Sequence, residues 1–290
     1  QLRRLRAMAQ VLGVEGVFPY DGDTPSATRR QARERGLVLL SNPDMLHYGL
    51  LPRHPDWAPF LARLRYVVLD ELHAYRGVFG THVALILRRL LRLARHYGAS
   101  PQVLAASATI ANAREHAEAL TGLPFEELKA QVARTERELL VLLPKPLDRR
   151  GERRRSPLLE AAYLARRLAE AGLKGLVFAG ARKSAELIAR YAAHPLVRPY
   201  RAGYTARERR RLEADLKEGR VRVLVSTSAL ELGVDIGELD AVVLVGYPGS
   251  TAAFWQRAGR AGRGERRALL VYIPREDPMD EYFLHRPALL

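Results

Sequence analysis

A pair of acidic residues ends a short apolar run in the segment YVVLDELHAYRG, residues 66–77. Asp70 and Glu71 follow the run directly, and His73 comes two positions later. Carboxylates at the end of a buried strand can hold a metal ion and activate a water molecule, which is the chemistry of nucleoside triphosphate hydrolysis. A solvated turn after a strand would carry the same two acids. The pair alone therefore leaves both interpretations open.

A second group of functional side chains lies in the segment WQRAGRAGRGE, residues 255–265. Gln256, Arg260 and Arg263 are spaced by four and three positions, so a helix would place them on one face. Only small residues stand between the arginines, which would let another surface approach closely. Two arginines in this setting suit a polyphosphate, because they can neutralise charge on a transferred phosphoryl group. An arginine-rich surface helix is the alternative, and it leaves the missing bulky side chains unexplained.

Apolar runs of strand length alternate with helical patterns along the chain. Strands are expected at 16–20, 36–41, 66–70, 103–109, 139–143, 175–180, 196–200, 221–227, 241–247 and 268–274. Helical patterns separate them; in the one at 81–98, Thr81 would cap the start and Gly98 would stop the helix. Nearly continuous apolar strands separated by helices indicate an α/β fold with parallel sheets covered on both faces. Ligands bind such sheets at the carboxyl ends of the strands, where Asp70 and Glu71 are expected.

The alternation is interrupted at PKPLDRRGERRRSP, residues 144–157. This stretch is rich in proline and arginine and separates two comparable series of strands and helices. We interpret it as a linker between a first domain at 1–143 and a second domain at 158–290, since two domains are usual for this length. The sequence has no apolar run long enough to span a membrane.

The chain is strongly basic, with 47 Lys and Arg against 32 Asp and Glu, a formal net charge of +15 and a sequence pI near 10.5. A field of that sign attracts polyanions, of which nucleic acid is the commonest. Solubility alone is the alternative reason for such a charge. Hydrophobic residues make up 48% and charged residues 27%, as in globular proteins. Without cysteine, the 290 residues have no disulfide and no thiolate metal site.

Several segments occur in the order and spacing of superfamily-two helicase motifs. DELH (70–73), SAT (107–109), VSTSALELGVDIGELD (225–240) and QRAGRAGR (256–263) resemble motifs II, III, V and VI. Finer features resemble one subgroup, the mitomycin repair factor A and Hrq-type DNA helicases: YDGDTP (20–25), SNPDMLH (41–47), RGVFGTH (76–82), GYPGS (246–250) and DPMDEYFLHRP (278–287). The resemblance covers almost the whole chain. It implies two tandem RecA-like domains, the first with motifs Ib, II and III and the second with motifs IV, V and VI, and ATP and Mg²⁺ as cofactors.

The resemblance implies catalytic roles for the acidic segment. Asp70 would hold Mg²⁺, and Glu71 would orient and deprotonate the attacking water. His73 would meet Gln256 or Ser107 and so link the ATP site to motif III. Ser107 would couple hydrolysis to unwinding. Without the resemblance, His73 would be an ordinary histidine, and Ser107 would satisfy backbone groups after a strand.

The remaining ATP-site residues are also implied by the resemblance. Thr109 would share the coupling role of motif III. Arg260 and Arg263 would reach the γ-phosphate from the second domain, with Arg263 as the arginine finger. Gly233 and Asp235 would approach the ribose and phosphates of the nucleotide. A tight turn that needs glycine is the alternative explanation of the motif V segment.

Nucleic-acid contacts are expected at the ends of several strands. In SNPDMLH, Asn42 can cap a helix whose first position is Pro43, and a helix start presents free N–H groups to a phosphate. This segment resembles motif Ib, which grips the tracking strand. Arg182 in motif IV, Arg201 in YRAGYTARERR and Thr227 in motif V would contact the same backbone. Such contacts fix position without reading base sequence.

No GxxxxGK[ST] phosphate loop occurs in the 290 residues. The chain resembles a helicase core without its first strands and without the C-terminal cysteine region of its relatives, so we expect the phosphate-binding half upstream and little ATPase activity from this part alone. Our interpretation is an ATP-dependent DNA helicase or translocase that moves 3′→5′ on single-stranded or partly duplex DNA. We expect a role in repair in the bacterial cytoplasm, near the nucleoid, without a membrane partner. A non-catalytic nucleic-acid-binding scaffold and an RNA-tracking helicase are the alternatives.

Overall fold

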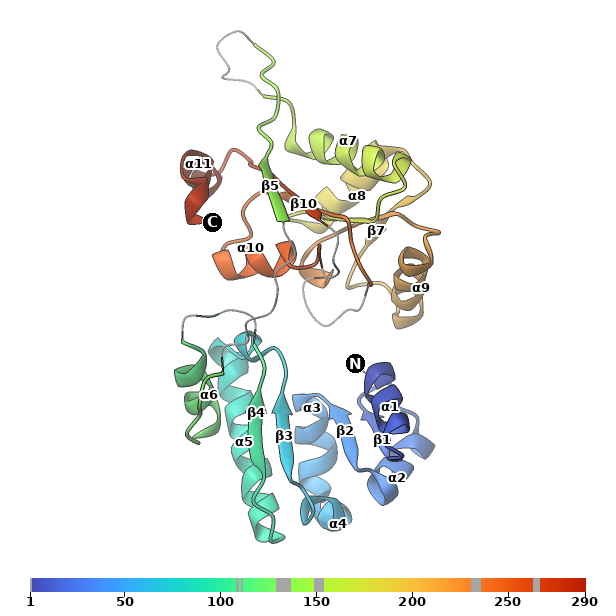
Figure 1. Ribbon diagram of the computed structural model, residues 1–290, viewed down its shortest axis with the longest axis vertical. Coiled ribbons are helices and arrows are strands. Elements are labelled where there is room, and N and C mark those ends of the chain that lie inside the picture. The colour runs from blue at the N-terminus through green and yellow to red at the C-terminus, as the bar shows by residue number, and fades with distance from the viewer. Residues whose placement is uncertain are drawn as a thin grey trace. The chain divides into compact units, whose positions relative to one another are not determined.

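The computed structural model describes residues 2–107, 110, 112–128, 137–148, 154–230, 236–262 and 267–290. The chain divides into two compact units, Gln1–Ala130 and Gln131–Leu290, and each is described by itself (Figure 1). All ten expected strands are present, each overlapping its expected range. The long apolar runs therefore predicted the strands well.

The first unit consists of short parallel strands and the helices that follow them. Its described elements are α1 (Leu2–Val11), β1 (Val17–Tyr20), α2 (Ser26–Arg35), β2 (Val38–Ser41), α3 (Pro43–Met45), a π-helical turn (Leu46–Leu50), a 3₁₀ segment (Leu51–Trp57), α4 (Ala58–Leu61), β3 (Tyr66–Leu69), a 3₁₀ turn (Leu72–Ala74), α5 (Gly77–His96), β4 (Gln102–Ala105) and α6 (Ala113–Thr121).

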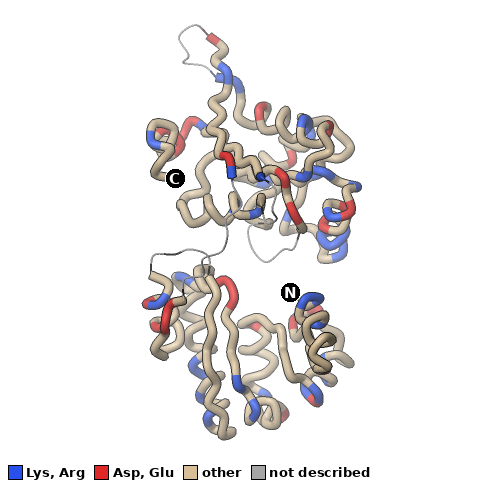
Figure 2. The backbone as a smooth tube through the Cα atoms, viewed as in Figure 1, with Lys and Arg blue, Asp and Glu red and all other residues tan. Residues whose placement is uncertain are grey.

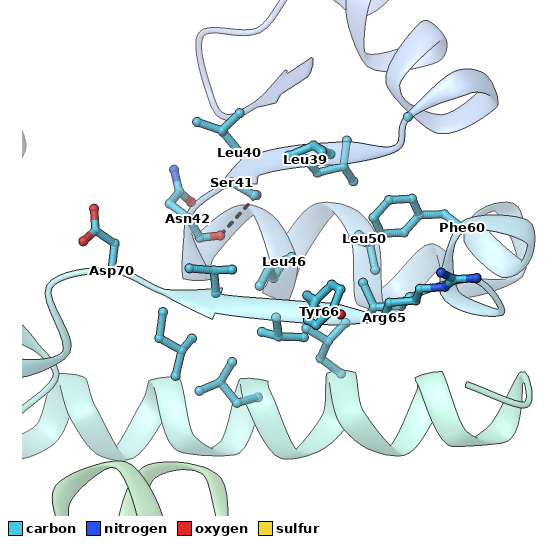
Figure 3. Close-up of a pocket in the computed structure, with 18 of the residues that line it drawn as sticks. Leu39, Leu40, Ser41, Asn42, Leu46, Leu50, Phe60, Arg65, Tyr66 and Asp70 are labelled. Carbon is cyan, nitrogen blue, oxygen red and sulfur yellow. Dashed lines mark hydrogen bonds between the residues drawn. The ribbon is translucent and has the colours of Figure 1, made fainter. Parts of the chain in front are cut away.

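The strands of the first unit form two separate parallel pairs. β1 pairs with β2, with Val17 opposite Val38, and β3 pairs with β4, with Tyr66 opposite Gln102. Within the described residues, no ladder joins β2 to β3. A groove of about 1390 Å³ lies between them (Figure 3). Its strand walls are open, since Val68 is 65% exposed. The expectation of parallel strands is confirmed, but these strands form no continuous sheet.

The longest helix, α5, covers β3 and β4 with an apolar stripe that recurs at helical spacing and includes Val83, Leu87 and Leu90. It begins four residues before the predicted start, so the prediction that Thr81 caps it is wrong. The Thr81 hydroxyl lies inside the helix and donates to the carbonyl oxygen of Gly77 at 3.1 Å. Gly98 follows the end of the helix with φ +89°, as the predicted stop requires.

The second unit contains one parallel six-stranded sheet in the order β5-β10-β9-β6-β8-β7. Its described elements are β5 (Arg137–Val141), α7 (Pro157–Glu170), β6 (Gly175–Phe178), α8 (Arg182–Ala192), β7 (Val197–Tyr200), α9 (Ala206–Glu218), β8 (Val223–Ser226), a 3₁₀ turn (Ser228–Leu230), β9 (Ala241–Val245), α10 (Thr251–Ala258), β10 (Ala268–Ile273), α11 (Pro278–His285) and a 3₁₀ turn (Pro287–Leu289). Every residue of β6, β8 and β9 is buried, which explains their continuous apolar sequence.

Two cores lie on opposite faces of this sheet, because successive strand residues point to opposite sides. One face packs against α7 and α8 through small residues such as Ala165 and Ala185. The other face packs against α9, α10 and α11, where Leu216, Phe254 and Phe283 are buried. The sheet is therefore covered on both faces, as predicted.

The predicted domain boundary at 143 is wrong. The strand predicted at 139–143 is β5, and it pairs with β10 of the second unit, with Leu139 opposite Leu270. The segment 144–157 therefore connects two elements of the second unit and is no interdomain linker. Its described ends are joined by a bridge between Pro146 and Arg154. Local sequence patterns could not predict this pairing, because the partner strand of β5 lies about 130 positions further along the chain.

Among the residues that the structure describes, no helix is long and apolar enough to cross a membrane.

Candidate functional site: an acidic loop and the strand ends around it

The acidic pair occupies a constrained loop at the carboxyl end of β3. Asp70 follows the strand, and Glu71 adopts left-handed backbone angles, φ 53° and ψ 46°. The loop is tied to the segment after β4, because Ala106 N donates to Leu69 O at 2.8 Å and Leu72 N donates to Ala106 O at 2.9 Å. Left-handed angles are unfavourable for a residue with a Cβ, and such strain clusters at functional sites. Here the two anchoring hydrogen bonds hold the strained residue.

His73 connects this acid to the segment that follows β4. The side chain of His73 is buried, and its Nε2 lies 3.5 Å from Glu71 Oε2. Its Nδ1 lies 3.3 Å from Ser107 Oγ. Of the two contacts predicted for His73, the one with Ser107 is thus observed within the first unit. One imidazole ring therefore lies between the Glu71 carboxylate and the Ser107 hydroxyl.

Two further side chains shape the loop. His116 on α6 lies with Nε2 at 3.2 Å from Leu72 O, to which it can only donate. Tyr75 stands just beyond the loop, and burial together with the negative charges of Asp70 and Glu71 raises its pKa. Neither residue is predicted by the sequence motifs. Tyr75 lies in the quoted acidic segment, whereas only the folded structure brings His116 to the loop.

The acidic loop suits a magnesium ion that is shared with a nucleotide. Among the described residues, no group of three His, Asp or Glu side chains forms a complete metal cage. Mg²⁺ bound together with a nucleotide uses one or two carboxylates, waters and the phosphates themselves. Asp70, exposed at the mouth of the groove, fits that role (Figure 3).

Asn42 and Asp70 lie at the same end of the groove, after β2 and β3 (Figure 3). Asn42 caps α3 as predicted, since its side-chain oxygen accepts from Met45 N at 2.9 Å. Pro43 occupies the first helical position. The start of α3 therefore faces the region where the acids also stand.

In the second unit, three predicted nucleic-acid residues share one edge of the sheet. Arg182 begins α8 after β6, Thr227 follows β8, and Arg201 follows β7. These strands are neighbours in the order β6-β8-β7, and parallel strands end at a common edge. Arg201 is also held by Glu186 at 3.0 Å and lies over the Tyr204 ring.

The arginine segment departs from its predicted geometry. Gln256 lies on α10, but that helix ends at Ala258, so the prediction that Gln256 and Arg260 share a helical face is wrong. Gly259 is the C-cap, Gly262 has φ +70°, and the backbone turns between them. Arg260 is buried, only 4% exposed.

Four predicted site residues lie outside the described residues: Thr109, Gly233, Asp235 and Arg263. Their roles stay predictions, as do the catalytic roles of Gln256 and Arg260. Lys and Arg positions are spread over both units, with Asp and Glu among them (Figure 2). The charge alone therefore marks no single binding face.

Comparison with known proteins identifies the two halves of the chain. Residues 1–140 match the DEAD/DEAH box helicase domain, and residues 158–265 match the helicase conserved C-terminal domain. The uncharacterized ATP-dependent helicase YprA of Bacillus subtilis is 42% identical over 279 residues, which cover 93% of this chain and 37% of that protein. The ATP-dependent helicase hrq1 of Schizosaccharomyces pombe is 35% identical over 94% of this chain and 27% of its own length.

A solved structure agrees with these matches. The crystal structure of the helicase MrfA bound to DNA and AMPPNP superposes with a TM-score of 0.90 at 40% identity, covering 100% of this chain and 42% of that one. The chain thus spans well under half the length of these relatives. It comprises two RecA-like domains, those of a DEAD/DEAH box helicase core, and is close to helicases of the MrfA and Hrq1 type.

Proposed function

We propose that the complete protein carrying this chain is an ATP-dependent DNA helicase or translocase that moves 3′→5′ and serves DNA repair in the bacterial cytoplasm. The relatives named above are ATP-dependent helicases, and MrfA has been crystallised with DNA and AMPPNP. The basic net charge supports a polyanionic track. The matches to RNA-bound helicases are 16–18% identical and support the fold alone.

The observation that carries the proposal is the connection from Glu71 through His73 to Ser107. Glu71 is the residue that would orient and deprotonate the attacking water. His73 contacts it at 3.5 Å and contacts Ser107 at 3.3 Å, so one imidazole ring links the acid to the segment after β4. A solvated turn would leave both acids in solvent, without a buried histidine between them and the next strand.

In this mechanism, Asp70 would hold Mg²⁺, which would supply charge neutralisation on the phosphate oxygens. Glu71 takes the proton of the water that attacks the γ-phosphate. Once Glu71 has taken up the proton, its contact with His73 changes. His73 transmits this change to Ser107 and so shifts the segment after β4. Arg260 and Arg263 are proposed to neutralise the developing charge.

We place the phosphate-binding loop directly after a strand of the complete protein, and this strand would insert between β2 and β3. The backbone of β3 prepares one side. Gln102 N bonds to Arg65 O and Ala106 N to Leu69 O, so the odd-numbered residues face β4. By alternation, the N–H and C=O groups of Tyr66 and Val68 face the groove and can pair with another strand. A parallel strand there would end between Asn42 and Asp70.

Hydrogen exchange tests this placement. The amide of Val68 should exchange fast in the 290-residue chain and slowly in the complete protein, because the inserted strand would protect it. The amide of Val67, which faces β4, serves as the internal control and should stay protected in both. Equal exchange of Val68 in the two proteins would show that no strand fills the groove.

The catalytic assignment is tested with Glu71→Gln in the complete protein. This variant should lose ATPase activity by at least about a hundredfold while binding single-stranded DNA with unchanged affinity, because the general base is lost and the binding surface is kept. Glu115→Gln, an exposed acid on α6, is the matched control. Normal turnover in Glu71→Gln would refute the assignment. ATPase stimulation by RNA but not by single-stranded DNA would refute DNA as the track.

A further inference from the structure

Arg275 lies across the carboxyl edge of the second sheet. It stands two residues after β10, yet its guanidinium reaches the ends of two other strands. A Cβ built on Gly246, after β9, would overlap Arg275 Nε, and one built on Gly180, after β6, would meet Nη1 at 3.0 Å. The two glycines therefore leave the space in which this side chain rests.

A buried carboxylate anchors Arg275. Asp280 on α11 is fully buried and lies with Oδ2 at 3.6 Å from Arg275 Nε. Its other oxygen accepts from Tyr247 N at 2.7 Å and from the Tyr272 hydroxyl. These contacts join the GYPGS segment to the DPMDEYFLHRP segment, two sequence features that the ATP site leaves unexplained. A buried carboxylate needs such partners, and here they also fix the position of a cation.

Arg275 keeps a surface toward solvent, since 42% of its side chain is exposed. It lies over the ends of β9 and β6, and Arg182, Thr227 and Arg201 follow β6, β8 and β7 at the same edge. Together the four residues extend along the edge from β10 to β7. The spacing between strands is about 4.8 Å, so this row spans several nucleotides of an extended strand.

We propose that Arg275 contacts the phosphodiester backbone of a nucleic-acid single strand at this edge, and that Asp280 is its positioning residue. The inference rests on the proposed function. The planar guanidinium has five N–H donors, so one side can face Asp280 while another binds a phosphate oxygen. Because Asp280 lies on α11, the packing of α11 would thereby affect the affinity of the second unit for the nucleic-acid strand.

The test measures the affinity of the complete protein for a single-stranded oligonucleotide over a series of salt concentrations. Loss of one phosphate contact should lower the slope of log affinity against log salt by about 0.7. Arg275→Gln should show this change, and its defect relative to wild type should shrink roughly 2.5-fold between 50 and 200 mM salt. Arg167→Gln is the matched control: Arg167 also pairs with a carboxylate, but it lies in the last turn of α7, near the opposite edge. It should leave the slope unchanged.

The role of Asp280 is tested by Asp280→Asn, alone and combined with Arg275→Gln. If Asp280 acts through Arg275, the double variant should have the slope of Arg275→Gln alone. If the ion pair only stabilises the fold, Arg275→Gln and Asp280→Asn should both lower the melting temperature and leave the slope of log affinity against log salt at its wild-type value. That result would overturn the proposal.

A second measurement on the wild-type protein avoids any folding defect. Bound oligonucleotide should protect Arg275 from an arginine-specific dicarbonyl reagent, as read by mass spectrometry, and leave Arg167 reactive. Unprotected Arg275 in a complex that binds DNA would overturn the contact while leaving the proposed function intact. A complete protein that binds no single strand at all would instead refute the proposed function.

Discussion

Replacing Glu71 by glycine and by alanine separates its backbone strain from its chemistry. Both variants remove the carboxylate and its contact with His73, so both should lack ATPase activity in the complete protein. They differ only in how they tolerate φ 53° and ψ 46°. Comparing them therefore isolates the strain in the loop.

The expected difference follows from two opposing terms. Alanine at left-handed angles costs about 1–2 kcal/mol relative to right-handed ones. Glycine avoids this cost but loses about 0.5–1 kcal/mol more conformational freedom on folding. The free energy of unfolding of the first unit should therefore be about 0.5–1 kcal/mol higher in Glu71→Gly than in Glu71→Ala.

Fluorescence can follow the first unit alone, because the chain has only two tryptophans. Trp57 is buried in the core of the first unit, whereas Trp255 belongs to α10. In a Trp255→Phe background, urea unfolding followed by fluorescence reports on Trp57. Ala193→Gly is the control, since Ala193 has φ 47° in the second unit and should leave the Trp57 transition unchanged.

A Glu71→Ala variant as stable as Glu71→Gly, or more stable, would refute the reasoning. It would mean that the loop relaxes to ordinary angles once the carboxylate is gone. The hydrogen bonds from Leu72 N and Ala106 N would then fail to hold the backbone. The left-handed backbone angles would then depend on the Glu71 carboxylate and would not be imposed by the loop backbone.

Three further predictions concern the second unit. Tyr272→Phe removes a hydroxyl that donates to buried Asp280 and should lower the free energy of unfolding by about 1.5–3 kcal/mol, measured by urea unfolding. Phe254→Ala should lower it by about 3–5 kcal/mol, because this side chain is fully buried in one core. Hydrogen bonds from the side chain and backbone of Thr205 lower the pKa of Glu208, so its contribution to α9 is present above its unfolded pKa and is lost as the pH falls through its folded pKa. Acid titration should show this loss in the parent chain and not in Glu208→Gln; an identical pH dependence would contradict it.

Local sequence patterns predicted the elements, because burial on both faces forces nearly continuous apolar runs. They predicted less well which strands pair. β5 follows the first series along the chain, yet its edge position beside β10 depends on residues beyond 267. The start of α5 was also missed, because its N-cap, Arg76, makes no side-chain capping bond that a sequence could reveal.

In the candidate site, too, local features were predicted from the sequence pattern and contacts between distant residues were not. The acids stand at a strand end, as the pattern of Asp70-Glu71 predicts, and Asn42 caps its helix. The contact between His73 and Ser107 joins positions 34 apart, and it was expected only from the resemblance to a family. Residue spacing alone predicts Arg260 on a helix, but α10 ends two residues earlier, at Ala258, with Gly259 as its C-cap.

Two carboxylates, Glu71 and Asp280, differ in how the fold surrounds them. Asp280 is fully buried and has two hydrogen-bond donors and an arginine around it, so its surroundings suit a fixed negative charge. Glu71 keeps 40% of its side chain exposed and contacts a histidine on a strained turn. A carboxylate that must take up a proton needs such one-sided pairing, because a strong cationic partner favours its charged form. The backbone hydrogen bonds of Leu72 N and Ala106 N therefore hold Glu71 in place and make no contact with its carboxylate. Adding a strong partner, for example by His73→Arg, should leave the loop folded and reduce ATPase activity in the complete protein.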